Sequence, residues 1–377
     1  MSVSGSAAAS DVAGDRRFMG LALALGRREL GRTWPNPAVG AVIVKDGEIV
    51  GRGWTQPGGR PHAEIEALRR AGEMARGATL YVTLEPCSHH GKSPPCADAV
   101  IASGIARVVS AMEDPNPEVA GRGHARLRSA GIAVDVGIEA AAARRDHAGH
   151  IRRVRDGLPH VMLKLAISAD GKAAGAGRKR VAITGNAVRD RVHLMRARSD
   201  AIVIGIGTVL ADDPVLTCRL PGMAKMSPTR VVLDAGLRLP VQSRLLATAG
   251  ETPLWIIAGN HAPAASETTV HEHGAEVLRV AEKAGRLDLG EVLKLLAQRG
   301  ITRVMVEGGP TVASALIEAD LVDEAVFFYS PLVIGQEGLP ALEPHALTML
   351  GQHLKPVSDE PVGPDRQETY ERGSDHV

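Results

Sequence analysis

Residues 61–96 read PHAEIEALRRAGEMARGATLYVTLEPCSHHGKSPPC, and this stretch decides the fold of the first half of the chain. Its apolar residues recur at helical spacing until Gly77, which is typical of a helix end. Residues 78–84 then form an apolar strand pattern, and a second helix is expected from Pro94. Because helix and strand alternate in this way, we predict an α/β fold with helices on both faces of a sheet.

The same alternation continues on both sides of this stretch. Upstream, residues 38–54 contain two β-branched runs around Asp46-Gly47, a strong hairpin signal, and a helix is expected over about residues 15–31. Residues 1–15 are small and polar and are predicted to be a disordered tail. Downstream we expect strands at 107–112 and 132–137, a helix at 123–131 and one charged helix at 139–156.

Gly157-Leu158-Pro159 interrupts the pattern, so we place a domain boundary there and predict domains at residues 16–157 and 158–377. Apolar segments suited to strands recur in the second domain, at HVMLKLAIS, AIVIGIG, TRVVLDA, TPLWIIAG, GITRVMVEGG and EAVFFYSPLVIG. The stretch after about residue 340 is rich in proline and charge. It is expected either to dock on the second domain or to fray.

Composition excludes several classes of function. The 377 residues carry 44 Lys+Arg and 43 Asp+Glu, a net charge of +1, and only 2% are aromatic. Nucleic-acid binders usually show a basic excess or aromatic stacking residues, so no nucleic-acid partner is expected. No apolar run could span a membrane and no secretion signal is recognisable. Three cysteines without a signal fit a cytoplasmic enzyme better than a disulfide-bonded protein.

Three residues of the deciding stretch form a candidate metal site. His62, Cys87 and Cys96 offer one imidazole and two thiolates, a set that suits Zn²⁺ and leaves a fourth tetrahedral position open, as a catalytic zinc requires. We therefore predict one zinc per chain. Zinc lowers the pKa of a bound water, and Glu64, two residues from His62, is placed to move that water's proton.

Other interpretations of these residues remain open. Each cysteine alone would more simply be a buried apolar residue, and His62 alone a helix cap. A closed structural zinc would need a fourth ligand, for which His89 and His90 are the candidates. Cys218 is interpreted as a half-buried thiol without function.

H-x-E followed by P-C and a second cysteine is the signature of zinc-dependent nucleobase deaminases. Here eight residues, SHHGKSPP, separate the cysteines instead of the usual two. With this insertion, and with TWPNPAVGAVIVKDG at 33–47 and EDPNPEVAGRGHARLRSAGI at 113–132, the chain closely resembles the bifunctional riboflavin-biosynthesis deaminase/reductases of bacteria over about residues 16–150.

The resemblance implies a cytidine-deaminase-like three-layer domain whose zinc is bound by His62, Cys87 and Cys96, with Glu64 as the catalytic proton donor. The implied substrate is 2,5-diamino-6-ribosylamino-4(3H)-pyrimidinone 5′-phosphate. Asn36, which lies between two prolines, is either a hydrogen-bonding partner of that substrate or a turn former.

Glycines follow two strands of the second domain. Gly205 and Gly207 stand after one strand, and Glu307-Gly308-Gly309 after another, where a helix opens at Pro310. Glycines at a helix N-terminus let a phosphate approach the backbone N–H groups. Each pair could equally be only a turn, and neither is the six-residue dinucleotide fingerprint.

In this order the motifs resemble the reductase half of the same family over about residues 159–335, a domain similar to dihydrofolate reductase in fold. The resemblance implies NADPH as hydride donor and reduction of the ribosyl group to a ribityl chain. By position, cofactor contacts fall on Ala166, Ala182, Thr208, Asp212 and the loop Gly309, Pro310, Thr311, Val312, Ala313, Ser314 and Ala315. Substrate contacts fall on Arg180, Arg196, Leu216, Arg219 and Glu307.

Two positions depart from the family pattern. Relatives commonly carry an aromatic residue where this chain has Ala182, and often a small polar residue where it has Arg180. One cofactor-stacking contact is therefore expected to be missing. Arg180, Arg196 and Arg219 together are expected to hold the phosphate of the substrate.

The alternatives to this function are a monofunctional deaminase with a degenerate reductase-like domain and, less in keeping with the charge and aromatic content, a nucleic-acid-editing deaminase. The expected partner is a small phosphoribosyl-pyrimidine. We expect no membrane partner, and we expect a homo-oligomer, a dimer or a tetramer.

Overall fold

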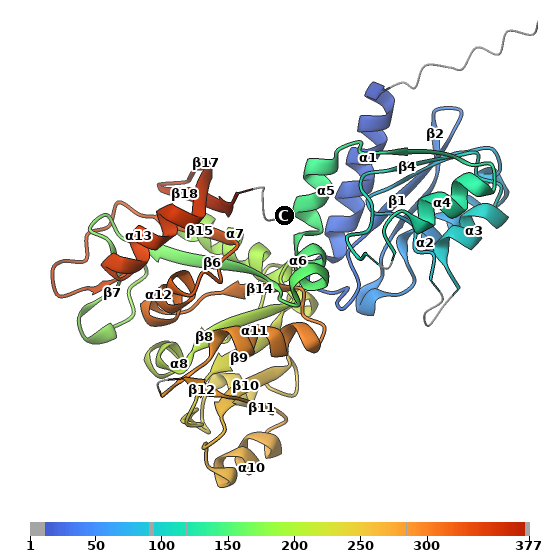
Figure 1. Cartoon of the computed structure of the whole chain (residues 1–377). Coiled ribbons are helices and arrows are strands. Elements are labelled where there is room, and N and C mark those ends of the chain that lie inside the picture. Colours follow the sequence, from blue (N-terminus) through green and yellow to red (C-terminus); the bar gives the residue numbers. More distant parts are fainter. Residues whose placement is uncertain (1–11, 90–93, 118, 284, 374–377) are drawn as a thin grey trace, which may run out of the picture. The chain divides into compact units, whose positions relative to one another are not determined.

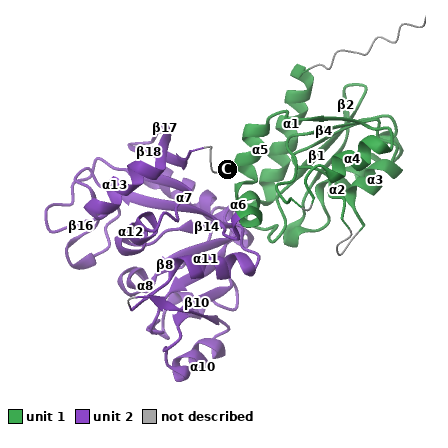
Figure 2. Ribbon diagram, in the orientation of Figure 1, with its two compact units in different colours: residues 1–155 green, residues 156–377 purple. Residues whose placement is uncertain are grey.

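The computed structural model describes residues 12–89, 94–117, 119–283 and 285–373, whose path is shown in Figure 1. The chain divides into two compact units, residues 1–155 and 156–377 (Figure 2). Each unit has its own main sheet. In the described part of the chain, no helix has both the length and the apolar character needed to cross a membrane.

The first unit is built on a five-stranded sheet in the order β2-β1-β3-β4-β5. β1 pairs antiparallel with β2 and β3, whereas β3, β4 and β5 run parallel. The strands are β1 (Gly40–Lys45), β2 (Glu48–Trp54), β3 (Thr79–Val82), β4 (Arg107–Ser110) and β5 (Ala133–Val136). The helices are α1 (Val12–Gly26), α2 (Ala63–Ala71), α3 (Cys96–Ala102), α4 (Arg122–Ser129), α5 (Ala140–Asp146) and α6 (Ala148–Asp156).

Two close backbone approaches show that helices cover both faces of this sheet. A Cβ atom added to Gly40 on β1 would lie 1.8 Å from the carbonyl oxygen of Ala22 on α1, and one added to Gly53 on β2 would lie 2.0 Å from that of Ala63 on α2. Gly53 pairs with Ala41, the neighbour of Gly40, and neighbouring residues of a strand face opposite sides. α1 and α2 therefore pack on opposite faces, which confirms the predicted three-layer α/β domain.

The prediction of a disordered tail through residue 15 is wrong for its last residues, while residues 1–11 lie outside the described part. α1 begins at Val12, and Asp15 is buried. Arg107 donates to both oxygens of Asp15 at 2.9 and 2.7 Å, and the Tyr81 hydroxyl donates at 2.8 Å. Arg107 above all holds the pKa of Asp15 below its ordinary value. Because these bonds tie the first turn to β3 and β4, the helix starts earlier than its apolar pattern indicates.

The charged segment 139–156 is two helices, not the single helix that the sequence predicts. α5 ends at Asp146 and α6 starts at Ala148, with His147 between them at φ −96° and ψ 8°. The buried ring of His147 places its Nε2 3.1 Å from the hydroxyl oxygen of Thr83, just after β3. This contact with the sheet anchors the break between the two helices.

The second unit is built on a nine-stranded sheet in the order β11-β10-β9-β8-β14-β6-β15-β18-β17. All strands from β11 to β15 in this order run parallel, and β18 and β17 add antiparallel at one edge. The strands are β6 (His160–Ile167), β8 (Ala201–Gly205), β9 (Thr229–Leu233), β10 (Leu254–Gly259), β11 (Glu276–Val280), β14 (Arg303–Val306), β15 (Glu324–Tyr329), β17 (Leu354–Val362) and β18 (Asp365–Arg372).

Among its described residues, the second unit also contains two short strand pairs and seven α-helices. The pairs are β7 (Lys172–Ala174) with β16 (Leu339–Pro340), and β12 (Glu282–Lys283) with β13 (Arg286–Leu287). The helices are α7 (Asn186–Ala197), α8 (Ile206–Asp212), α9 (Arg244–Ala247), α10 (Ala264–Glu272), α11 (Leu289–Gln298), α12 (Pro310–Glu318) and α13 (Pro344–His353).

The parallel strands bring the sequence motifs of this unit to one edge of the sheet. β8, β14, β6 and β15 lie side by side and run the same way, so the loops after them emerge at the same edge. Ligands of α/β sheets bind at the carboxyl ends of the strands. The segments after Gly205 and Val306 therefore meet where a cofactor is expected.

The proline-rich stretch after about residue 340 docks and does not fray. It forms α13 and then the β17–β18 hairpin, which extends the sheet beyond β15. Pro356 and Pro361 argue against an interior strand because proline cannot donate a backbone hydrogen bond. β17 is the edge strand, where a missing donor costs little.

Candidate functional site

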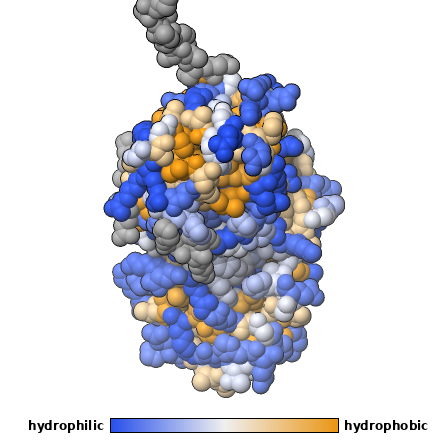
Figure 3. Space-filling view, turned by 90° about the vertical axis from the view of Figure 1, so that its right-hand side faces the viewer, coloured by the Kyte–Doolittle hydropathy of each residue, from blue (hydrophilic) through white to orange (hydrophobic). Residues whose placement is uncertain are grey.

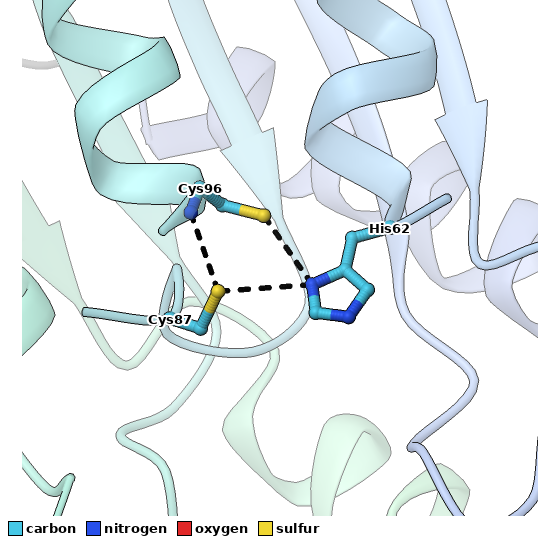
Figure 4. A group of neighbouring side chains, drawn as sticks. All are labelled: His62, Cys87 and Cys96. Atoms are coloured by element: carbon cyan, nitrogen blue, oxygen red, sulfur yellow. Dashed lines mark hydrogen bonds between the residues drawn. The ribbon is translucent and has the colours of Figure 1, made fainter. Parts of the chain in front are cut away.

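The predicted metal ligands of the first unit converge (Figure 4). His62, Cys87 and Cys96 offer ligand atoms that all lie within 4.8 Å of one another. The Nδ1 atom of His62 is 3.3 Å from the Cys96 sulfur and 3.7 Å from the Cys87 sulfur. His89, a proposed fourth ligand, is exposed and outside this cluster, and His90 lies outside the described residues. Among described residues the cluster thus has three donors, the number that leaves one tetrahedral position open.

Two helix N-termini position this cluster. His62 is the residue that precedes α2, and Cys96 is the first residue of α3. The backbone N–H of Cys96 donates to the sulfur of Cys87 at 3.3 Å. Hydrogen bonds from Cys96 lower the pKa of Cys87 to about 4, against the effect of burial, and the Cys87 thiolate raises the pKa of His62. The cluster therefore already favours a thiolate, the form that binds a metal.

Glu85 fixes the loop that carries Cys87, a role that the sequence reasoning missed. Its buried carboxylate accepts hydrogen bonds from the backbone N–H groups of Asp114, Gly121, Gly123 and His124, at 2.7 to 3.2 Å. A Cβ atom added to Gly123 would lie 2.1 Å from the carbonyl oxygen of Pro86. The only local signal was an acidic residue at the end of an apolar strand, where a solvent-exposed carboxylate is the ordinary expectation.

Glu64 lies in the first turn of α2 and is buried beside the cluster. Burial raises the pKa of Glu64 to about 7, and the nearby His62 opposes that shift. Its carboxyl group also interacts with the Cys96 thiol. A carboxyl group with a pKa near neutrality can both accept and donate a proton, as general acid–base catalysis requires.

Asn36 lies next to the same cluster. Its Nδ2 donates to the carbonyl oxygen of Gly59 at 2.8 Å and is 3.5 Å from Nε2 of His62. Its backbone N–H also closes a turn with the carbonyl oxygen of Thr33. Asn36 is thus a turn residue, and at the same time its side chain borders the candidate metal site.

In the second unit, two helix N-termini meet at the carboxyl edge of the sheet. The backbone N–H of Gly309, which precedes α12, donates to the Thr208 hydroxyl oxygen on α8 at 3.2 Å. The predicted loop from Gly309 to Ala315 is in fact the start of α12. Pro310, Ala313 and Ser314 are buried, and the Ser314 hydroxyl accepts from the backbone N–H of Glu343. Thr311 is exposed, and Val312 and Ala315 are half-buried.

A buried charge cluster lies at the same edge. Arg196 donates through Nε and Nη2 to the two carboxylate oxygens of Glu307, each at 2.9 Å, and through Nη1 to the carbonyl oxygen of Thr217. Lys164 Nζ is 3.7 Å from Glu307 Oε1. Burial alone would raise the pKa of Glu307, but Arg196 and Lys164 hold it below its ordinary value. This geometry corrects the expectation that Arg196 presents a free guanidinium to a phosphate.

Replacing Arg196 with methionine is expected to destabilise the protein by about 3 kcal/mol, because removal of one partner from a buried ion pair leaves an uncompensated charge. Lys164 compensates part of the loss, which keeps the effect at the low end. Urea unfolding followed by circular dichroism measures the change. Arg219→Ala, at an exposed position, serves as control and should change stability by less than about 0.5 kcal/mol. Equal stabilities of the two variants would contradict the role of the pair.

The other predicted residues of this unit divide into two groups. Leu216 is buried in the apolar core with φ 61°, and Cys218 is fully buried, not half-buried as expected. Arg180, Ala182 and Arg219 are exposed, whereas Ala166 and Asp212 are half-buried. Burial raises the pKa of Asp212, and the charge of Arg180 opposes that shift. Burial lowers the pKa of Arg219, and Arg180 is among the cations that add to this shift, so Arg180 lies near both residues.

Comparison with known protein families defines the class of each unit. Residues 13–112 match the zinc-binding region of cytidine and deoxycytidylate deaminases, and residues 159–366 match the RibD C-terminal domain. The first unit thus has the fold of a zinc-dependent deaminase and the second that of a RibD-type reductase. The class is a bifunctional deaminase and reductase that uses zinc and NADPH.

Individual relatives identify the family. The chain is 44% identical over 345 residues to the riboflavin biosynthesis protein RibD of Escherichia coli (strain K12), covering 87% of this chain and 92% of that protein. A structure of Acinetobacter baumannii RibD matches with a TM-score of 0.85 at 35% identity, over 97% of this chain and 100% of that chain. The Thermotoga maritima deaminase/reductase matches with a TM-score of 0.82 at 34% identity, over 96% and 99%. This chain belongs to the RibD family of riboflavin biosynthesis proteins.

Proposed function

We propose that the first unit deaminates 2,5-diamino-6-ribosylamino-4(3H)-pyrimidinone 5′-phosphate and that the second then reduces its ribosyl group to a ribityl chain. We assign deamination to residues 16–157 and reduction to residues 158–377. The observation that carries the proposal is the buried carboxyl of Glu64 beside a three-donor cluster with one open position. A riboflavin-pathway deaminase and reductase activity is what the family membership establishes.

The donor set of His62, Cys87 and Cys96 fits zinc in number, softness and convergence. Bound zinc supplies Lewis acidity that lowers the pKa of water to near neutrality. In deamination, a water oxygen adds to the ring carbon that carries the exocyclic amine, and the carbon–nitrogen bond then breaks. Glu64 takes a proton from the water and delivers it to the amine nitrogen, so that ammonia leaves. Asn36 would accept a hydrogen bond from the substrate through its Oδ1, since its Nδ2 already donates a hydrogen bond to the carbonyl oxygen of Gly59.

The second unit fits a phosphate-bearing dinucleotide at the N-termini of α8 and α12. Gly207 and Gly309 have no side chain there, and Thr208 joins the two helix starts through the N–H of Gly309. NADPH would supply the hydride that adds to C1′ of the ribosyl group, while the bond from C1′ to the ring oxygen breaks and that oxygen takes up a proton to become a hydroxyl group. Lys164, Arg196 and Glu307 form the buried polar group of this site, and Glu307 is the member with acceptor oxygens. Glu307 would accept from hydroxyl groups of the substrate.

A direct assay tests the whole proposal. The purified protein is incubated with the diaminopyrimidinone phosphate, with and without NADPH, and ammonia release and NADPH oxidation are followed separately. Ammonia release without NADPH, and NADPH oxidation only after deamination, are the expected results. Ammonia release with no NADPH oxidation would instead support the monofunctional deaminase, and salt-sensitive binding of single-stranded RNA or DNA would support a nucleic-acid-editing enzyme.

The partner, assembly and location are also part of the proposal. A small-molecule substrate accords with the family, and we propose a cytoplasmic homo-oligomer without a nucleic-acid or membrane partner. Figure 3 shows apolar residues among hydrophilic ones on the face that it displays. Exposed large apolar side chains of the described residues include Leu21, Ile49, Met74, Leu332 and Val333. Exposed apolar surface supports subunit contacts, and light scattering of the purified protein tests this.

Arg219→Ala is expected to weaken binding of the 5′-phosphorylated substrate of reduction roughly 10- to 100-fold, because a hydrogen bond to a charged group contributes about 1.5–3 kcal/mol. Its exposed guanidinium has no ion pair with any residue in the described ranges and is free to meet a phosphate. Arg180→Ser should act in the same direction but more weakly. Calorimetric titration with phosphorylated and dephosphorylated compound is the measurement. Equal losses for both compounds would show that Arg219 serves another part of the substrate.

A further inference from the structure

Arg178 stands at the glycine-bearing edge of the second unit without an assigned role. It follows Gly177 in a short turn and has φ 66°. A Cβ atom added to Gly207 would lie 3.4 Å from Nη1 of Arg178, so the guanidinium lies against Gly207. This distance is an ordinary van der Waals contact, so the end of the Arg178 side chain reaches the backbone at Gly207.

This contact puts the guanidinium at the start of α8, one residue from the side chain that contacts the start of α12. Gly207 is the second residue of α8, and the next residue, Thr208, accepts a hydrogen bond from Gly309 at the start of α12. Arg178, Gly207, Thr208 and Gly309 thus form a continuous series of contacts. Helix N-termini and a guanidinium are complementary to the same ligand group, a phosphate.

The N–H donors of the Arg178 guanidinium are available to a ligand. It is exposed, and it makes no hydrogen bond or ion pair with any residue that the structure describes. Ala182, four residues further on, is exposed as well and offers only a methyl group to a cofactor ring. The segment that leads from β7 to α7 can therefore hold a cofactor by charge but has little with which to stack on it.

We propose that Arg178 binds a phosphate group of NADPH. The proposal rests on the use of NADPH by the second unit. The phosphate group that Arg178 binds is either in the pyrophosphate or at the 2′ position of the cofactor. NADH contains the pyrophosphate but lacks the 2′-phosphate, so it distinguishes the two.

The test measures binding, not turnover. Isothermal titration calorimetry with NADPH and with NADH, in the absence of pyrimidine substrate, compares the full-length wild type with Arg178→Ala and Arg178→Lys. Arg189→Ala is the matched control, because Arg189 is an exposed arginine on α7 outside the site. We expect R178A to weaken NADPH binding roughly 10- to 100-fold, R178K to weaken it less, and R189A to leave it unchanged. Unaltered zinc content and thermal unfolding establish that each variant is folded.

The ligands separate the two phosphates. A loss with NADPH but not with NADH assigns Arg178 to the 2′-phosphate, and an equal loss with both assigns it to the pyrophosphate; either result supports the proposal. The affinity of R178A should also depend less on salt than that of the wild type. If the wild type binds NADPH and R178A binds it equally well, the role of Arg178 is wrong while the use of NADPH stands. If the wild type does not bind NADPH, both are wrong.

Discussion

The Glu64→Gln variant is expected to retain its zinc and to lose deamination by at least about 10²–10⁴-fold, the range that general acid–base catalysis contributes. Glutamine has nearly the same size as glutamate but cannot accept or deliver a proton at its side chain. Because Glu64 is not one of the three convergent donors, the metal site should remain intact. Ammonia release at saturating substrate measures the effect, and metal analysis of the same sample establishes zinc content.

Reduction provides the internal control for this variant. Glu64 belongs to the first compact unit, whereas the reductase residues belong to the second. NADPH oxidation with already deaminated substrate should therefore proceed at the wild-type rate in the E64Q variant. A parallel fall of both activities would mean that the two sites do not act independently, and full deamination by E64Q would exclude Glu64 as the proton carrier.

Cys87→Ser and Cys96→Ser are each expected to lose the zinc and, with it, all measurable deamination. Thiolates are the softer and stronger donors of the set, and a serine hydroxyl is not ionised at neutral pH, so one imidazole and one thiolate remain. Hydrogen bonds with Cys96 already favour the thiolate form of Cys87. Cys87 is half-buried whereas Cys96 is buried, so Cys87 is the more accessible test position. Elemental analysis after dialysis gives the zinc content per chain.

Cys218→Ser is the matched control for the two ligand variants. Cys218 is the third cysteine, is fully buried, and lies in the other compact unit. Its replacement should leave one zinc per chain. Zinc retained in both Cys87→Ser and Cys96→Ser would contradict the ligand assignment.

Local features of this chain were determined by the sequence alone. Asp46-Gly47 predicted the hairpin between β1 and β2, and the structure confirms it with positive φ at both residues, 51° and 81°, as a two-residue turn between antiparallel strands requires. The H-x-E and P-C motifs predicted which donors would converge. These features depend on residues close in sequence and on the chemistry of a few side chains, so they could be predicted from the amino-acid sequence alone.

Contacts between distant segments were decided only by the tertiary structure. Arg196 and Glu307, 111 residues apart, were both expected to face the substrate, yet they bind each other. Nothing near either residue in sequence indicates this, because the pair exists only where β14 adds next to β8 and brings the end of α7 within reach. Glu85 likewise accepts from four backbone N–H groups of a segment 29 to 39 residues away, which runs from Asp114 into the first turn of α4. The order of the strands in the sheet determines which distant side chains lie next to each other. A buried charge must then be paired or hydrogen-bonded, so it binds the polar group that lies nearest in the fold.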